Sequence, residues 1–161
     1  MQVCYTAGSV YTVENRAGRL IEVKIGSPLS MEDVQQFVQK YQAVMRQIPG
    51  GKYIGVVNLL EAYVFPPAVI QALSQLLSGA GSHVLRSAYL IGESAVFGLQ
   101  VERVIHEARH PDRRAFRNGR ELVTWISEGL TPGEKREVER FIGEATHATP
   151  FAFPVSRTKP Q

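Results

Sequence analysis

The chain has 161 residues, of which 44% are hydrophobic and 20% charged, and a formal net charge of +3. This balance is typical of one globular domain that buries a core without disulfides or metals. A single cysteine, Cys4, excludes an intramolecular disulfide and fits a reducing compartment, so we expect a cytoplasmic protein. No apolar segment approaches the roughly 18 residues of a membrane span, and no signal-peptide pattern opens the chain. We therefore expect no membrane insertion.

The first predicted element is a β-hairpin between residues 10 and 25. Polar and apolar residues alternate in both arms, which is the period of a strand. Gly18 lies between the arms, where the turn needs a permissive backbone. Gly26 and Pro28 end the second arm.

Helices and strands alternate after the hairpin. Ser30 and Asp33 have the spacing of a helix-capping pair, and Asn118 and Glu121 repeat this pattern near the end of the alternation. Nearly continuous apolar runs predict strands that are covered on both faces. We expect strands at residues 53–60, 84–93 and 113–118, and helices at residues 30–48, 66–77, 94–108 and 119–128.

A further helix is predicted at residues 131–146, followed by a proline-containing tail at residues 147–161 that we expect to be flexible. The order of the elements predicts an α/β fold with a mostly parallel sheet and one antiparallel edge. Residues 1–130 are expected to form one domain. The role of the additional helix stays open: it covers the sheet, exchanges between subunits, or projects into solvent.

Four segments carry a resemblance: "IGSPLSMEDV", "IGVVNLLEAY", "RSAYLIGESAVFGLQVERVI" and "RAFRNGRELVTWI". Their order and spacing resemble the STAS-like family, which is related to the sporulation anti-sigma-factor antagonists. Members show a glycine and a proline-leucine step before the first helix, a central strand that ends in aspartate, and a closing phenylalanine, cap and tryptophan. The matching residues here are Gly26, Pro28, Leu29, Asn58, Phe116, Asn118 and Trp125.

The resemblance covers residues 10–126. It implies a STAS-like mixed sheet of about five strands, with an N-terminal antiparallel hairpin and four helices, plus the extra C-terminal helix. It also implies a bacterial regulatory or signalling role through protein binding. Two departures matter. Asn58 replaces the usual aspartate, and no serine or threonine occurs between Leu59 and Gln71 to serve as a phosphorylation site.

Catalytic groups are sparse in the sequence. Cys4 lies outside any motif, and no Gly-x-Ser-x-Gly pattern occurs. His106 and His110 are spaced to present two ligands to one metal, but no third ligand is evident. The segment "SGAGS" lacks the Lys-Ser/Thr ending of a phosphate loop and is interpreted as a helix end. We therefore expect a protein that is not an enzyme and holds no metal or cofactor.

Arginines concentrate near the last predicted strand and the helix after it. A helix N-terminus favours anions, so the group is a candidate patch for an acidic partner or a phosphate. Interleaved acidic residues favour the alternative, a solvated mixed-charge surface. Nucleic acid is not expected, because no aromatic residues or recognition helix accompany the cations. The patch comprises Arg113, Arg114, Arg117 and Arg120.

Two function classes remain open. The first is a non-enzymatic regulatory domain that docks a partner protein, or a second copy of itself as a homodimer, through Tyr63, Val64, Phe65 and Asn58. This loop follows a parallel strand, where such sheets bind ligands. The second is a carrier or sensor of a small hydrophobic, lipid-like ligand, because STAS-like folds resemble lipid-carrying domains built from a sheet and helices.

Overall fold

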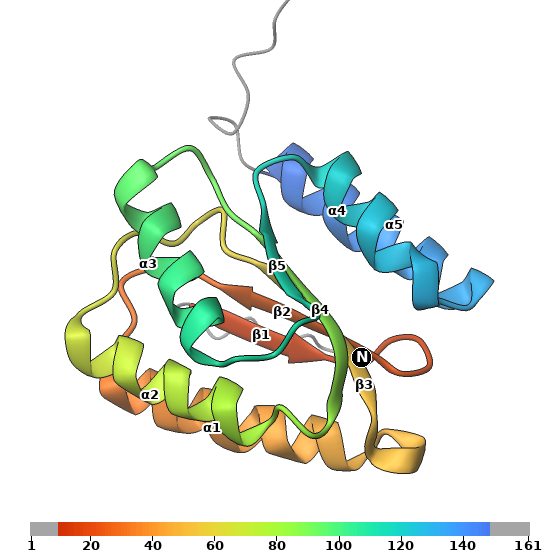
Figure 1. Ribbon diagram of the computed structural model, residues 1–161, viewed down its shortest axis with the longest axis horizontal. Helices are drawn as coiled ribbons and strands as arrows, with labels where there is room; N and C mark the ends of the chain where they lie inside the picture. The colour runs from red at the N-terminus through yellow and green to blue at the C-terminus, as the bar shows by residue number, and fades with distance from the viewer. Residues whose placement is uncertain (1–9, 149–161) are drawn as a thin grey trace, which may run out of the picture.

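The computed structural model describes residues 10–148 of the chain, which form one five-stranded sheet and five α-helices (Figure 1). The strands lie in the order β1-β2-β3-β4-β5, with β1 antiparallel to β2 and the other neighbours parallel. They are β1 (Tyr11–Glu14), β2 (Leu20–Ile25), β3 (Tyr53–Asn58), β4 (Val84–Leu90) and β5 (Arg113–Phe116). The helices are α1 (Met31–Arg46), α2 (Pro67–Gly79), α3 (Ala95–Glu107), α4 (Gly119–Ile126) and α5 (Pro132–Ala148).

The strand order determines which helices cover which face. Each parallel strand pairs with the next one along the chain, so successive right-handed crossovers place α1, α2 and α3 on the same face. Helices α4 and α5 cover the opposite face (Figure 1). The predicted α/β architecture, with its antiparallel N-terminal hairpin, is thereby confirmed.

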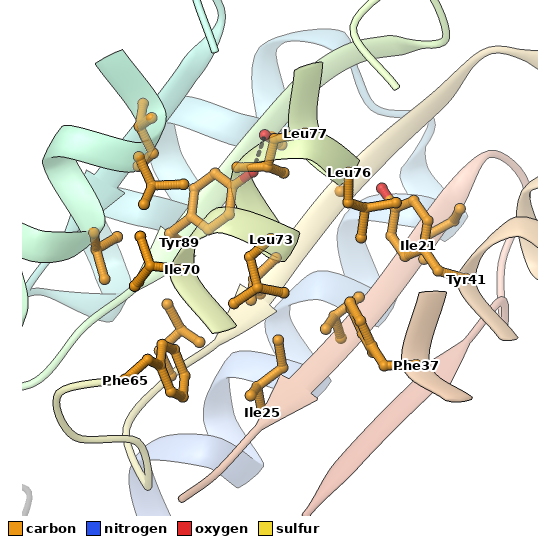
Figure 2. A pocket seen from close by; sticks show the side chains of 18 residues that line it. Ile21, Ile25, Phe37, Tyr41, Phe65, Ile70, Leu73, Leu76, Leu77 and Tyr89 are labelled. Carbon is orange, nitrogen blue, oxygen red and sulfur yellow. Dashed lines mark hydrogen bonds between the residues drawn. The ribbon is translucent and has the colours of Figure 1, made fainter. Parts of the chain in front are cut away.

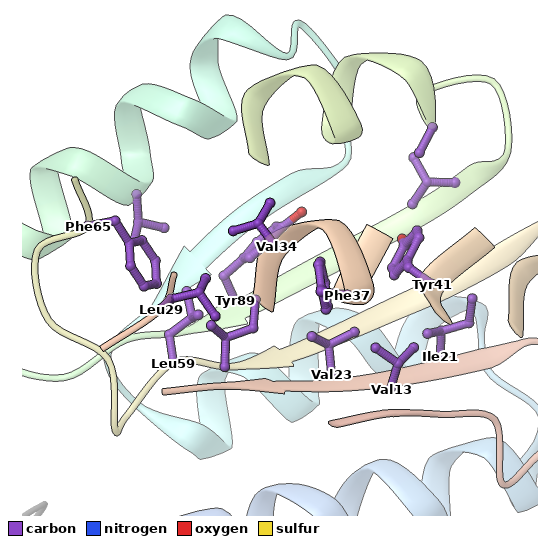
Figure 3. Close-up of a cluster of buried hydrophobic side chains, with 14 of the residues drawn as sticks. Val13, Ile21, Val23, Leu29, Val34, Phe37, Tyr41, Leu59, Phe65 and Tyr89 are labelled. Atoms are coloured by element: carbon purple, nitrogen blue, oxygen red, sulfur yellow. The ribbon is translucent and has the colours of Figure 1, made fainter. Parts of the chain in front are cut away.

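The first core fills the space between the sheet and α1, α2 and α3 (Figure 3). Alternate residues of β2 point to this face, because successive strand side chains point to opposite sides. Ser30 caps α1 and forms the predicted reciprocal hydrogen bonds with Asp33. This cap fixes the start of α1, whose buried face packs against the sheet. This core includes Ile21, Val23, Ile25, Val34, Phe37, Tyr41, Phe97 and Val101.

The second core lies under α4 and α5. Helix α5 covers this face of the sheet, which is one of the three roles that the sequence left open for the additional helix. Asn118 caps α4 by accepting from the backbone N–H groups of Arg120 and Glu121. The residues buried here include Leu20, Ile54, Val56, Leu90, Phe116, Leu122, Ile126, Val138 and Ile142. The predicted tail, apart from the last helical residues, lies outside the described residues.

A buried carboxylate anchors α5 to the hairpin. Glu134 accepts hydrogen bonds from the Arg19 backbone N–H (2.7 Å), the Arg19 guanidinium (2.9 Å) and the Thr131 N–H (2.9 Å). Burial alone would raise the pKa of Glu134, but these hydrogen bonds outweigh it and lower that pKa to about 2. Gly18 has a φ of +46°, and a Cβ there would lie 2.5 Å from the Glu134 carboxylate. The turn therefore needs glycine for two reasons.

A second carboxyl group, Glu22 of β2, lies beneath α5 with 2% of its side chain exposed. Arg140 of α5 approaches it at 3.4 Å and also pairs with Glu137 and Glu144. Burial raises the pKa of the Glu22 carboxyl to about 8, and the neighbouring Glu137 contributes in the same direction. The folded protein therefore favours the protonated form of the Glu22 carboxyl group.

We expect Glu22→Gln to stabilise the protein at alkaline pH by several kcal/mol, because a rise of the pKa from 4.5 to about 8 corresponds to about 5 kcal/mol at most. The raised pKa means that the wild type loses stability as pH rises from the ordinary value of 4.5 through about 8, whereas the neutral amide does not ionise. Urea unfolding at pH 5 and pH 9 measures this. The two proteins should be nearly equally stable at pH 5, and a variant less stable than wild type at pH 9 would contradict the interpretation.

Candidate functional site

An apolar cavity of about 80 Å³ lies in the first core, between the sheet and α1, α2 and α3 (Figure 2). Protein interiors contain few voids larger than a water molecule, so this volume is notable for a domain of this size. The cavity is lined from three strands and three helices. Among its wall residues are Ile21, Val23, Phe37, Gly55, Val57, Phe65, Ile70, Leu73, Leu76, Leu77, Val101 and Ile105.

Helix α2 forms the loosest wall of this cavity. Of its residues, Val69 is buried, whereas α1 buries four. The apolar stripe of α2, which includes Leu73, Leu76 and Leu77, is half-buried and faces the cavity (Figure 2). Because few buried contacts hold an element in place, such an element opens at lower free energy than the rest of the fold. Helix α2 is therefore the wall best suited to admit a ligand.

Hydroxyl groups occupy parts of the cavity wall. Tyr41 shares a hydrogen bond with Tyr53, and Ser87 donates to the hydroxyl of Tyr89 (3.1 Å, Figure 2). Burial raises the pKa of Tyr41 well above its usual value, and burial also raises the pKa of Tyr53 to about 12. These phenols stay protonated at neutral pH and can donate hydrogen bonds.

Arg113 approaches the cavity from β5. It donates to the Tyr89 hydroxyl (2.9 Å) and to the Leu77 carbonyl at the C-terminal end of α2 (2.8 Å). Its side chain is buried, with an exposed fraction of 6% for the residue. The sequence placed Arg113 in a surface patch with its neighbours, whereas strand alternation directs it, with Ala115, toward the side of the first core.

The other three predicted arginines are exposed, and of these Arg114 lines the same groove as Arg113. Arg114 lies over the ring of Phe116, at 5.2 Å from its centroid. Arg117 donates to the Gly92 carbonyl and lies against Gly98 of α3. Arg120 is exposed in the first turn of α4.

The aromatic loop after β3 divides into an exposed and a buried part. Tyr63 and Val64 are 58% and 47% exposed, whereas Phe65 is 5% exposed. The Phe65 ring packs edge-on against Phe97 at 5.5 Å, and both backbone polar groups of Phe65 bond to the Gln100 side chain at 2.9 Å. Phe65, which was expected to be a partner contact, therefore has its ring in the first core.

Asn58, also predicted as a contact, is 5% exposed. Its Oδ1 accepts from the Leu60 backbone N–H at 3.0 Å, which holds the turn that follows β3. A neutral amide serves this turn without the cost of burying a carboxylate. Its place is therefore inside the fold rather than on a docking surface.

The predicted histidine pair does not assemble a metal site. His110 bonds to the Val84 carbonyl and to the Asp112 N–H. Within residues 10–148, no three side chains of His, Cys, Asp or Glu are grouped so that they could hold a metal ion. In the same part of the chain, no helix is long and apolar enough to cross a membrane.

Comparison with known proteins bears on the fold. Neither a family model nor a curated protein matches this chain. Among solved structures, an uncharacterised DUF3478-family protein from Shewanella loihica PV-4, described as having a SpoIIAA-like fold, is 12% identical with a TM-score of 0.56. The similarity covers 72% of this chain and 93% of that chain. The chain therefore has a SpoIIAA-like fold, which is the fold that the resemblance of its motifs implied.

Proposed function

We propose that the protein is a carrier or sensor that binds a small apolar molecule in the cavity between the sheet and α1, α2 and α3. The observation that carries this proposal is a cavity of about 80 Å³ walled almost entirely by aliphatic and aromatic side chains. An engineered apolar cavity of about 150 Å³ binds benzene and xenon. The present volume suits a short chain, and a longer one requires α2 to move outward.

Energetics favour an occupied cavity. An empty apolar cavity costs roughly 24 cal/mol per Å³, which is about 2 kcal/mol for 80 Å³. An apolar ligand recovers this free energy and adds about 0.8 kcal/mol for each methylene group that leaves water. These terms are large beside the net stability of a domain, which is 5–15 kcal/mol. Ligand binding should therefore stabilise the fold measurably.

Native mass spectrometry of freshly purified protein tests the proposal. We expect a peak heavier than the chain mass by one small molecule, which disappears after denaturation and refolding. Incubation of the refolded protein with hexan-1-ol should restore a bound mass and raise the melting temperature. If the native protein carries no extra mass, and apolar molecules leave its melting temperature unchanged, the cavity is a packing defect.

A second candidate function is docking of a second copy of the chain. The exposed side chains of Tyr63 and Val64 come from the loop after β3, and α3 contributes Val96 and Leu99, which are 66% and 67% exposed. The buried Phe65, bonded to Gln100 of α3, links the loop to this helix. Exposed apolar side chains on two segments joined in this way favour a protein contact.

We expect the double variant Tyr63→Ser and Leu99→Ser to weaken self-association at least tenfold, because both positions lose exposed apolar area that a contact would bury. Sedimentation equilibrium over a range of concentrations measures the dimer dissociation constant. The control is Leu85→Ser, which removes an exposed leucine from β4. A wild-type chain that stays monomeric at all concentrations, or a control that weakens association equally, would rule out this docking surface.

A further inference from the structure

Arg113 is a buried cation without an anionic partner. Three acidic or basic side chains are buried in the described part of the chain: Glu22, Glu134 and Arg113. Glu134 has Arg19 at 2.9 Å, and Glu22 has Arg140 at 3.4 Å. The bonds of Arg113 go instead to a neutral phenol and a backbone carbonyl. A buried charge is stabilised well by an opposite charge and poorly by neutral groups.

The guanidinium also has unused donors. Arginine has five N–H donors in a fixed fork. Among the described residues, Nη1 and Nη2 each make one bond, and the buried Nε has no partner. The Leu77 carbonyl lies at the negative end of the α2 dipole, which offsets part of the charge. A fork with a free Nε–H and further Nη–H groups matches the two oxygens of a carboxylate.

Arg113 lies between two hollows. On one side, its partners Tyr89 and Leu77 belong to the wall of the apolar cavity. On the other side, Arg113 itself lines an open groove between α3 and β5. Ile105 lines both hollows, so the cavity and the groove adjoin at this point. A molecule with an apolar tail in the cavity would present its other end at the guanidinium.

The groove carries a mixed set of charges. Its cations are Arg109, Arg113 and Arg114, and His106 and His110 also line it. Its acidic residues are Glu102 and Glu107, and Glu107 is paired with Arg103 at 3.0 Å. The arginines therefore outnumber the carboxylates along the groove, which favours a ligand with an anionic end.

We infer that the ligand of the apolar cavity is a monocarboxylic acid, with its tail between α2 and the sheet and its carboxylate on the Arg113 guanidinium and the Tyr89 hydroxyl. The inference rests on the proposed function and specifies its ligand class. One buried guanidinium supplies one positive charge, which a monocarboxylate neutralises. A phosphate group, with about two negative charges at neutral pH, would leave one unmatched.

The test compares straight-chain acids with alcohols of the same carbon number. Calorimetric titration with butyrate, hexanoate and octanoate should show affinity that rises roughly fourfold per methylene until the cavity is full. Each acid should bind at least tenfold more tightly than its alcohol. In Arg113→Gln this preference should fall below threefold while alcohol binding persists. Arg120→Gln, which removes an exposed arginine of α4, should keep the wild-type preference.

The outcomes separate the two proposals. Alcohols that bind as tightly as acids to the wild type would overturn the carboxylate inference and leave the apolar-ligand proposal standing. If neither series binds, both proposals fail. Should Arg113→Gln not fold because the bond to α2 is lost, Tyr89→Phe serves as the second variant. It removes one donor to the carboxylate and should reduce the acid preference at least threefold, and an unchanged preference would overturn the inference.

Discussion

Replacing Leu73 with tryptophan is expected to abolish the binding of apolar ligands while the protein stays folded. Leu73 lies in the middle of the cavity wall on α2 (Figure 2) and is half-buried, so a larger side chain can enter the cavity without displacing a strand. We expect at least a 100-fold loss of affinity for hexan-1-ol by calorimetric titration. The variant should also recover part of the roughly 2 kcal/mol that the empty cavity costs.

The control for this substitution is Leu99→Trp. Leu99 lies on α3 and is 67% exposed, so the same change adds a ring to solvent-facing surface. Its ligand affinity should remain within about twofold of wild type. If Leu73→Trp binds hexan-1-ol as tightly as wild type, the ligand occupies some other site. If it unfolds, overpacking outweighs the space in the cavity, which contradicts the cavity as described.

Glu134→Gln is expected to destabilise the protein by about 3 kcal/mol at pH 7. The amide retains the size of the carboxyl group but loses its negative charge. In the wild type, the charged carboxylate accepts hydrogen bonds from the Arg19 guanidinium and two backbone N–H groups. Its lowered pKa means that the carboxylate contributes stability above the ordinary value of 4.5, and that this contribution is lost as pH falls toward 2. Wild type and variant should therefore converge in stability near pH 2.

Urea unfolding at pH 7 and at low pH measures this difference. The matched control is Glu107→Gln, which breaks an exposed pair with Arg103 on α3 and should cost less than about 0.5 kcal/mol. We expect different losses of stability because the Glu134 side chain is 2% exposed, whereas the Glu107 side chain is 50% exposed. Equal losses in the two variants would show that α5 is not anchored through Glu134.

The elements of this fold follow from local patterns in the sequence. The Ser30–Asp33 spacing predicted the start of α1, and the cap at Asn118 predicted the start of α4, because both depend on residues a few positions apart. The layer that α5 forms did not follow from such patterns. Glu22 alternates with apolar residues of β2. This pattern does not indicate that α5, more than 100 residues away in the sequence, covers Glu22 and brings Arg140 to it.

The site was harder to predict for a similar reason. Periodicity indicates which face of α2 is apolar, but it does not give the distance between that face and the sheet, so the cavity under Leu73 was not predicted. In the sequence, Arg113 and its neighbours form one cluster of charges. Its position on β5, alternate to Phe116, was the signal for an inward side chain. The burial of Phe65 does not follow from the sequence, because a loop residue belongs to no periodic pattern from which burial can be inferred.

The central claim, that an apolar molecule binds between the sheet and α1, α2 and α3, is tested most directly by methyl NMR during titration with hexan-1-ol. The two cores lie on opposite faces of one sheet and provide an internal control. We expect chemical-shift changes at the methyl groups of Val23, Leu73 and Val101, which line the cavity. Leu122 and Val138 of the second core should not shift. Unchanged cavity methyl groups, or changes confined to exposed residues, would contradict the account.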